Sequence, residues 1–211
     1  MRNHLLAATV LALSIFPKAV LAGPATQPSA VAEVDTNPEA TLKTIEKLQK
    51  PLPELRFSGN PLSDVIDFLR DVTAANIYVD WAQLEKAGIG KDAQISLRLK
   101  DAKLATVLDA VAKAAGPDGN VSFGINAGVI EFTSTAQLSS RMLVAVYDES
   151  KSSIPPEKLA DVIRSTIDPA AWATGSSIKI VDSKLLITAS MLNHRRIAEL
   201  LPSLTTPVGG L

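Results

Sequence analysis

Apolar and polar positions follow two different periods along the chain, and each period predicts one kind of element. Over residues 55–58 apolar and polar residues alternate, which predicts a half-buried strand. Over residues 62–72 apolar residues recur every three or four positions, the spacing of one face of a helix. Asn60 and Pro61 combine an N-cap residue with a first-turn proline, so we expect the helix to begin there.

The same pattern recurs 42 residues later along the chain. Six apolar positions have an apolar partner at that offset: Leu55, Phe57, Leu62, Val65, Ile66 and Leu69 pair with Leu97, Leu99, Leu104, Val107, Leu108 and Val111. Further short elements complete the pattern: a strand over 76–79, a helical turn over 80–87, and strands over 121–125 and 129–133 around a tight turn. The sequence therefore predicts a β-α-β-β-α-β-β domain over residues 53–135, built on a repeated strand–helix–strand unit.

A second small domain is predicted over residues 141–205. Its expected elements are a strand over 142–147, a helix over 156–167, a hairpin over 178–187 and a helix over 193–204. The predicted order is β-α-β-β-α. The fold class is thus α+β in both domains, with helices packed on small mixed sheets. The edge strands of such sheets present unpaired N–H and C=O groups to which another strand can add.

The chain begins with a pattern that is typical of a secretory signal. Arg2 precedes an apolar run, and Val20-Leu21-Ala22 fits a cleavage site, so we expect a signal peptide over 1–22 that is removed after Ala22. Residues 23–52 are predicted to be a flexible linker with a short helix near its end, and residues 206–211 a tail. No later stretch is long and apolar enough to span a bilayer. We therefore expect the protein to be periplasmic or otherwise exported.

Three segments resemble a known family: LRFSGNPLSDVIDFLRDVTAANIYVD, ISLRLKDAKLATVLDAVAKAAG and VSFGINAGVIEFTS. Together they resemble the secretin/TonB short N-terminal domain, over about residues 53–135. Residues 141–205 are similar to the ring-building module of secretins, through LADVIRSTIDPAAW, IKIVDSKLLITAS and NHRRIAELLPSL. The resemblance implies a periplasmic module used in ring assembly and partner docking, not in catalysis. No secretin β-barrel region follows in the sequence, so we expect a module without a barrel of its own.

Composition narrows the chemistry further. Lys+Arg is 21 and Asp+Glu is 22, so the net charge is −1 and there is no strong field to attract nucleic acid or an anionic membrane. The chain has no cysteine, which excludes disulfides, thiol nucleophiles and cysteine-bound zinc. We expect no cofactor and no metal. Asp64, Asp67 and Asp71 lie on one helix face, but a calcium site needs six or more oxygens, and a solvated helix face explains them more simply.

Five residues are candidates for partner contact: Trp81, Trp172, His194, Arg195 and Arg196. A tryptophan can anchor a partner, although it more often covers the end of its own core. The two arginines can hold a carboxylate or phosphate of a partner, and the simpler interpretation is a solvated helix start. The unperturbed pKa of a histidine lies near neutrality, so His194 has the properties of a general base, but no serine–histidine–aspartate order is evident.

The sequence thus predicts an exported, non-catalytic protein–protein interaction module that takes part in docking or assembly in an envelope or secretion complex. Its partner is expected to be a protein, such as an outer-membrane or secretion-complex component, and self-association into a homo-oligomer is compatible with the same patterns. Two alternatives stay open: a peptide-receiving signalling or regulatory domain as in TonB-dependent transducers, and a hydrolase that uses His194 with a nearby serine.

Overall fold

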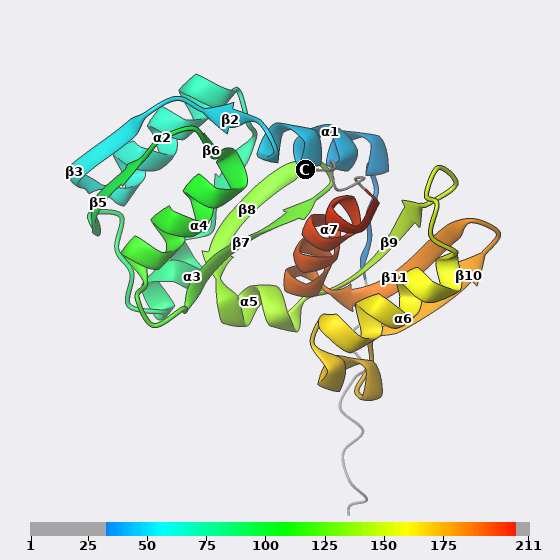
Figure 1. The fold of residues 1–211 in the computed structure, drawn as a ribbon. Coiled ribbons are helices and arrows are strands. Elements are labelled where there is room, and N and C mark those ends of the chain that lie inside the picture. The colour runs from blue at the N-terminus through cyan, green and yellow to red at the C-terminus, as the bar shows by residue number, and fades with distance from the viewer. Residues whose placement is uncertain (1–32, 206–211) are drawn as a thin grey trace, which may run out of the picture.

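A computed structural model describes residues 33–205 of the chain, and these residues form a mixed α+β fold. Figure 1 shows two groups of elements side by side, with helices lying on small sheets in each. The predicted fold class is confirmed. The predicted signal peptide and its cleavage after Ala22, the linker before residue 33 and the tail over 206–211 lie outside the described residues. Within residues 33–205 no helix has the length and apolar character needed to cross a membrane.

The first unit contains the elements predicted for residues 53–135, in the predicted order, and one further short strand, β6, that was not predicted. They are β3 (Leu55–Pro61), α2 (Leu62–Thr73), β4 (Ile77–Val79), α3 (Trp81–Lys86), β5 (Gln94–Leu99), β6 (Ala102–Lys103), α4 (Leu104–Ala115), β7 (Val121–Asn126) and β8 (Val129–Ser134). β3 pairs with β5 antiparallel, and β4, β8 and β7 form a three-stranded sheet in that order. The tight turn between β7 and β8 is Ala127-Gly128, both with positive φ.

The two copies of the repeat face each other across the β3–β5 pair. α2 and α4 begin and end 42 residues apart, at Leu62–Thr73 and Leu104–Ala115. In the strand pair, Leu55 lies opposite Leu99 and Phe57 opposite Leu97, so each position pairs with the copy of the other. Such an exchange of equivalent positions is what an approximate two-fold axis between the two copies produces. The apolar faces of α2 and α4 are buried in one core with Phe123 and Phe132.

One detail of the sequence prediction is wrong. Asn60 does not cap α2: it lies within β3, and its Oδ1 accepts a hydrogen bond from the Ser58 N–H at 2.9 Å. Pro61 is the residue before the helix, and the Leu62 N–H donates to the Ala93 carbonyl at 2.9 Å. Backbone carbonyls of the segment before β5 therefore accept the hydrogen bonds of the first N–H groups of the helix, in place of a side-chain cap.

The second unit is a four-stranded sheet, in the order β1-β9-β11-β10, with helices on one face. Its elements are β1 (Glu33–Val34), β9 (Met142–Asp148), α6 (Pro156–Thr166), the short 3₁₀ helix η1 (Pro169–Ala173), β10 (Ser177–Val181), β11 (Lys184–Ser190) and α7 (Met191–Thr205). β10 and β11 form the predicted hairpin. β1 pairs with β9 in parallel over only two residues, because Asn37 then caps a helix and turns the chain away.

Residues 33–52, predicted as part of the linker, form β1, α1 (Pro38–Leu48) and β2 (Pro51–Leu52), which pairs with β6. α1 lies against the β7–β8 turn. The Thr44 hydroxyl donates to the Gly128 carbonyl at 2.7 Å, and the Gly128 N–H donates to the Thr41 hydroxyl at 3.1 Å. A Cβ on Gly128 would lie 2.6 Å from the Ala40 Cβ, so this turn requires glycine both for its φ of +83° and for the approach of α1.

The two units are joined by α5 (Thr135–Ser140), which the sequence did not predict, and by the start of α7. Leu138 of α5 is buried with Leu143, Met191 and Leu192 in a small cluster between the units. A Cβ on Gly124 of β7 would lie 2.7 Å from the Met191 Cγ, so glycine allows α7 to approach the strand. The exact boundary between the two predicted domains stays a prediction.

Candidate partner-binding site

The strand β9 has an open edge beyond the end of β1. The Asp35 N–H donates to the Val144 carbonyl at 3.1 Å, so the backbone groups of Val144 face β1. On the other side of β9, the Glu149 N–H donates to the Ser183 carbonyl at 2.9 Å. Backbone groups alternate in direction along a strand, so the N–H and C=O of Val146 face the β1 side. β1 ends at Val34, and no described residue bonds to these two groups there.

In two other edge strands, a backbone carbonyl accepts a hydrogen bond from an arginine side chain. In β4, the Arg70 guanidinium donates twice to the Ile77 carbonyl, at 2.9 and 2.7 Å. In β10, Arg164 donates to the Ile178 carbonyl at 3.4 Å. Charged side chains on a sheet edge hinder the addition of another strand. The edge of β9 at Val146 has no such cover among the described residues.

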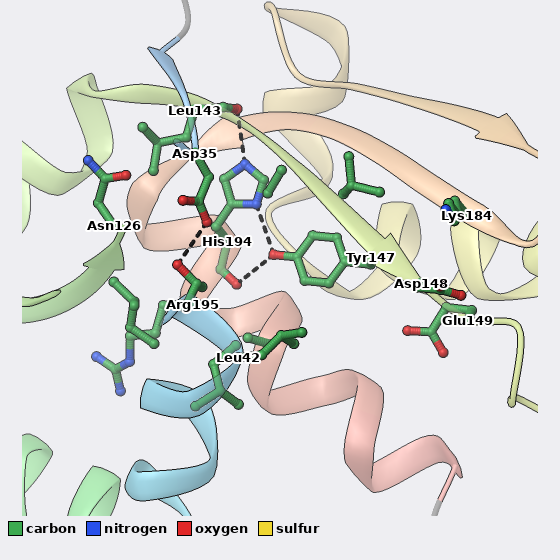
Figure 2. Close-up of a pocket in the computed structure, with 16 residues that line it drawn as sticks. Asp35, Leu42, Asn126, Leu143, Tyr147, Asp148, Glu149, Lys184, His194 and Arg195 are labelled. Carbon is green, nitrogen blue, oxygen red and sulfur yellow. Dashed lines mark hydrogen bonds between the residues drawn. The ribbon is translucent and has the colours of Figure 1, made fainter. Parts of the chain in front are cut away.

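A groove with a volume of about 360 Å³ lies along this edge. One wall is β9 from Leu143 to Asp148 with the following Glu149, and the others are α1, the start of α7 and the end of β7 (Figure 2). Its apolar lining includes Leu42, Ile45, Ile125, Val146 and Ala198. Leu42 is 62% exposed and Val146 is 53% exposed, both high for large apolar side chains. The volume lies at the lower end of the range of ligand pockets.

His194 lies at the base of the groove and fastens α7 to β9. Its Nε2 lies 3.0 Å from the Leu143 carbonyl oxygen, which can only accept, so Nε2 carries the proton. Its Nδ1 then accepts from the Tyr147 hydroxyl at 2.9 Å (Figure 2). The two rings are stacked, with centroids 6.0 Å apart. Both ring nitrogens are used within the fold, and neither contacts a serine. This geometry provides no general base.

Burial explains the ionisation of this pair. Burial lowers the pKa of His194, against weaker opposing effects of the Leu143 carbonyl and the Asp35 carboxylate. Burial also raises the pKa of the Tyr147 phenol, and the negative charge of Asp35 adds to that effect. Both groups are therefore neutral near pH 7.

Arg195 links the second unit to the first. Its guanidinium contacts Asp109 of α4 at 2.5 Å, the Ser122 hydroxyl of β7 at 2.8 Å and Glu199 of α7 at 2.9 Å. It also lies over the ring of Phe123, 3.9 Å from the centroid. The side chain is only 10% exposed. An arginine held by these four contacts acts as a structural connection between the units.

The other three candidate residues differ in exposure. Trp81 begins α3, packs against the first core and lies under Lys91, whose Nζ is 5.5 Å from the ring centroid. Trp172 in η1 packs against the second core and donates from Nε1 to the Ile167 carbonyl at 2.8 Å. Arg196 is exposed, with no hydrogen bond or ion pair to any described residue. Whether any of the five contacts a partner stays a prediction.

Sequence reasoning did not single out the groove or the residues of the β9 edge. The run Leu143-Val144-Ala145-Val146-Tyr147 is apolar on both faces of the strand, which is typical of a strand covered on both sides. Val146 is nevertheless exposed. The sequence signal that indicates an open edge here is an apolar strand that lacks the lysine or proline with which edge strands are usually protected.

Comparison with known proteins gives matches among solved structures. No protein-family model matches the sequence, and no curated protein matches it. Among solved structures, the chain is similar to the type IV competence pilus secretin PilQ of V. cholerae, at 19% identity and a TM-score of 0.29. That match covers 73% of this chain and 38% of the PilQ chain.

Two further matches are secretion proteins as well. The N-terminal domain of the secretin XcpQ from Pseudomonas aeruginosa is 16% identical, with a TM-score of 0.27, over 72% of this chain and 64% of that chain. The GspC–GspD complex from the type II secretion system of enterotoxigenic Escherichia coli is 14% identical, with a TM-score of 0.27, over 74% of this chain and 98% of that chain. The chain thus spans less than two thirds of the PilQ and XcpQ chains. The finer resemblance to the short N-terminal domain stays a prediction.

Proposed function

We propose that this chain is a non-catalytic interaction module that docks a protein partner in an envelope or secretion complex. The observation that carries the proposal is the open edge of β9 at Val146, which borders an apolar groove. The sequence resemblance to secretin periplasmic modules supports it. The use of His194 and Arg195 in internal contacts also supports it, because the two most reactive candidates are committed to the fold.

A regulatory domain that receives a signalling peptide is the second candidate, and the same groove favours it. A single open edge beside a narrow groove accommodates one added strand, as a peptide receiver requires. Docking in a complex and peptide reception differ in the lifetime and stoichiometry of the bound state. The first predicts a stable assembly, and the second a transient one at a stoichiometry of one to one.

Site-specific cross-linking in living cells tests the proposed function. A photoreactive amino acid replaces Val146, which is 53% exposed beside the groove, in the full chain. The matched control replaces Val72 on α2, which is the same residue type and 50% exposed. We expect position 146 to give a cross-linked protein, identified by mass, that position 72 does not give. The absence of such a protein at position 146 would contradict a docking role for this edge.

A further inference from the structure

We propose that the groove beside β9 binds an extended segment of the partner that adds to the edge of β9 as a strand, with apolar side chains inward and a lysine or arginine next to Glu149. This inference rests on the proposed function and specifies the binding mode and the chemistry of the partner segment.

The backbone geometry favours addition of a strand. β1 already pairs with β9 at Glu33 and Val34, which shows that this edge accepts a parallel strand. The chain leaves the edge after Asp35, whose N–H makes the last bond to β9. Beyond that bond, the Val146 N–H and C=O face outward with no partner among the described residues. An incoming segment would therefore continue the line of β1 and satisfy both groups.

The side walls of the groove determine which side chains fit. In an added strand, alternate side chains point to opposite faces of the sheet. Those on the helix side would lie against Leu42 and Ile45 of α1 and Ala198 of α7, all apolar. Those on the other side would lie beside Val146, which is now largely exposed. Burial of these surfaces favours small or branched apolar residues in the segment.

The charges at the end of β9 favour a basic residue. Hydrogen bonds from the Ser150 side chain and from the Ser150 N–H, the latter at 3.0 Å, lower the pKa of Asp148, and Lys184 and Lys151 act in the same direction. Glu149 differs, since its carboxylate makes no hydrogen bond or ion pair to a described residue. Its pKa is raised by burial and by the adjacent charge of Asp148. Asp35 adds another carboxylate to the groove, whereas the cation Arg195 is already paired with Asp109 and Glu199.

A second copy of this chain fits the site less well. An antiparallel pair of two β9 edges centred on Val146 would require Val144 of each copy, and Val144 is already paired with Val34. It would also place Asp148 of each copy opposite Val144 of the other, beside Asp35, whose N–H bonds to Val144, so like charges would approach each other. The open length of edge and its charge therefore favour a segment of a different protein.

Binding of defined peptides to the full chain, purified as the cell processes it, tests the inference. The probes are fluorescent heptapeptides of alternating valine and lysine, of alternating valine and glutamate, and the valine–lysine peptide with N-methylated valines. We expect the valine–lysine peptide to bind at least tenfold more tightly than either of the others at low salt. The N-methyl groups block strand pairing without a change of charge.

Matched variants then locate the binding. Val146→Pro removes the outward N–H and leaves the pairing with β11 in place, because that N–H does not face β11. We expect at least a tenfold loss of valine–lysine binding in V146P, and less than a twofold change in I180P, an equivalent proline on the outer edge of β10. Val146→Ala keeps the N–H and separates its loss from that of the side chain. Glu149→Gln should reduce the preference for lysine over glutamate at least threefold.

Several results would overturn the inference. They are the absence of valine–lysine binding to the wild type, equal binding by V146P and the wild type, and equal binding of the N-methylated peptide. A wild-type dimer that V146P converts to a monomer would identify a second copy as the occupant and overturn it too. Cross-linking at position 146 combined with any of these results would retain the proposed function and reject the strand-addition mode. Melting curves of all variants confirm that each one is folded.

Discussion

Replacement of Arg195 by methionine removes the connection between the two units and keeps most of the apolar stem. Three kinds of contact are lost: the hydrogen bond to Ser122, the ion pairs with Asp109 and Glu199, and the contact with the Phe123 ring. A hydrogen bond from a charged donor contributes about 1.5 kcal/mol. Each of the two ion pairs contributes on the order of 0.5 kcal/mol, because both carboxylates are more than 40% exposed. The cation–π contact adds about 1 kcal/mol.

Together these contacts predict a loss of about 3.5 kcal/mol in the free energy of unfolding for Arg195→Met. For a chain of this size that loss corresponds to a fall in Tm of roughly 7–14 °C. The next residue provides the control. Arg196→Met changes the same side chain on the same helix, but Arg196 is exposed and makes no such contact, so we expect a change within about 0.5 kcal/mol.

Urea titrations of wild type, R195M and R196M, followed by circular dichroism, measure these differences. Arg195 also joins the units, so R195M should broaden the transition or divide it into two, as the units lose cooperativity. Equal midpoints for R195M and R196M would refute the assignment of Arg195 as a connection between the units.

Three further predictions concern other parts of the fold. Burial lowers the pKa of His194 below its value in the unfolded chain, so the unfolded chain takes up the proton at a higher pH than the folded one. The free energy of unfolding is therefore at its full value above about pH 6.5 and falls as the pH is lowered through that value. Urea titrations between about pH 7 and pH 5 should show this fall in wild type and a smaller one in His194→Gln. Gly124→Ala should destabilise by about 1–3 kcal/mol through its contact with Met191, and a double-mutant cycle with Met191→Ala should show that the second change relieves part of that cost. Arg70→Met should uncover the edge of β4 and increase self-association measured by light scattering, whereas Arg56→Met, at an exposed residue of β3, should not.

The long elements could be predicted because their signals are local. The period of the apolar residues of α2 and α4 depends only on neighbours in sequence, and so do the turns at Gly128 and Asp182. The short strands could not be predicted. β1 exists because Val34 meets Val144, 110 residues later, and a two-residue strand has no period of its own.

The candidate site depended on distant contacts even more. Four elements form the groove, and the sequence does not show that α1 approaches β9, α7 and the end of β7. His194 was recognised as a titratable residue, but its roles follow from the Tyr147 hydroxyl and the Leu143 carbonyl, which only the fold brings to it. The open edge at Val146 exists because Asn37 starts a helix and the preceding strand ends.

The exchange of equivalent positions across β3 and β5 has a consequence for how this unit could have arisen. Leu55 pairs with Leu99 and Phe57 with Leu97, as two identical subunits pair across an isologous interface. In a shorter chain with one copy, that strand would be exposed in the monomer and would be buried only by pairing with a second molecule. The stability of such a chain would therefore depend on its concentration. Joining two copies in one chain replaces that dependence with a fixed effective concentration, on the order of millimolar for short connections. The first unit thus contains, within a single chain, a strand pairing of the isologous kind that joins the subunits of a homodimer.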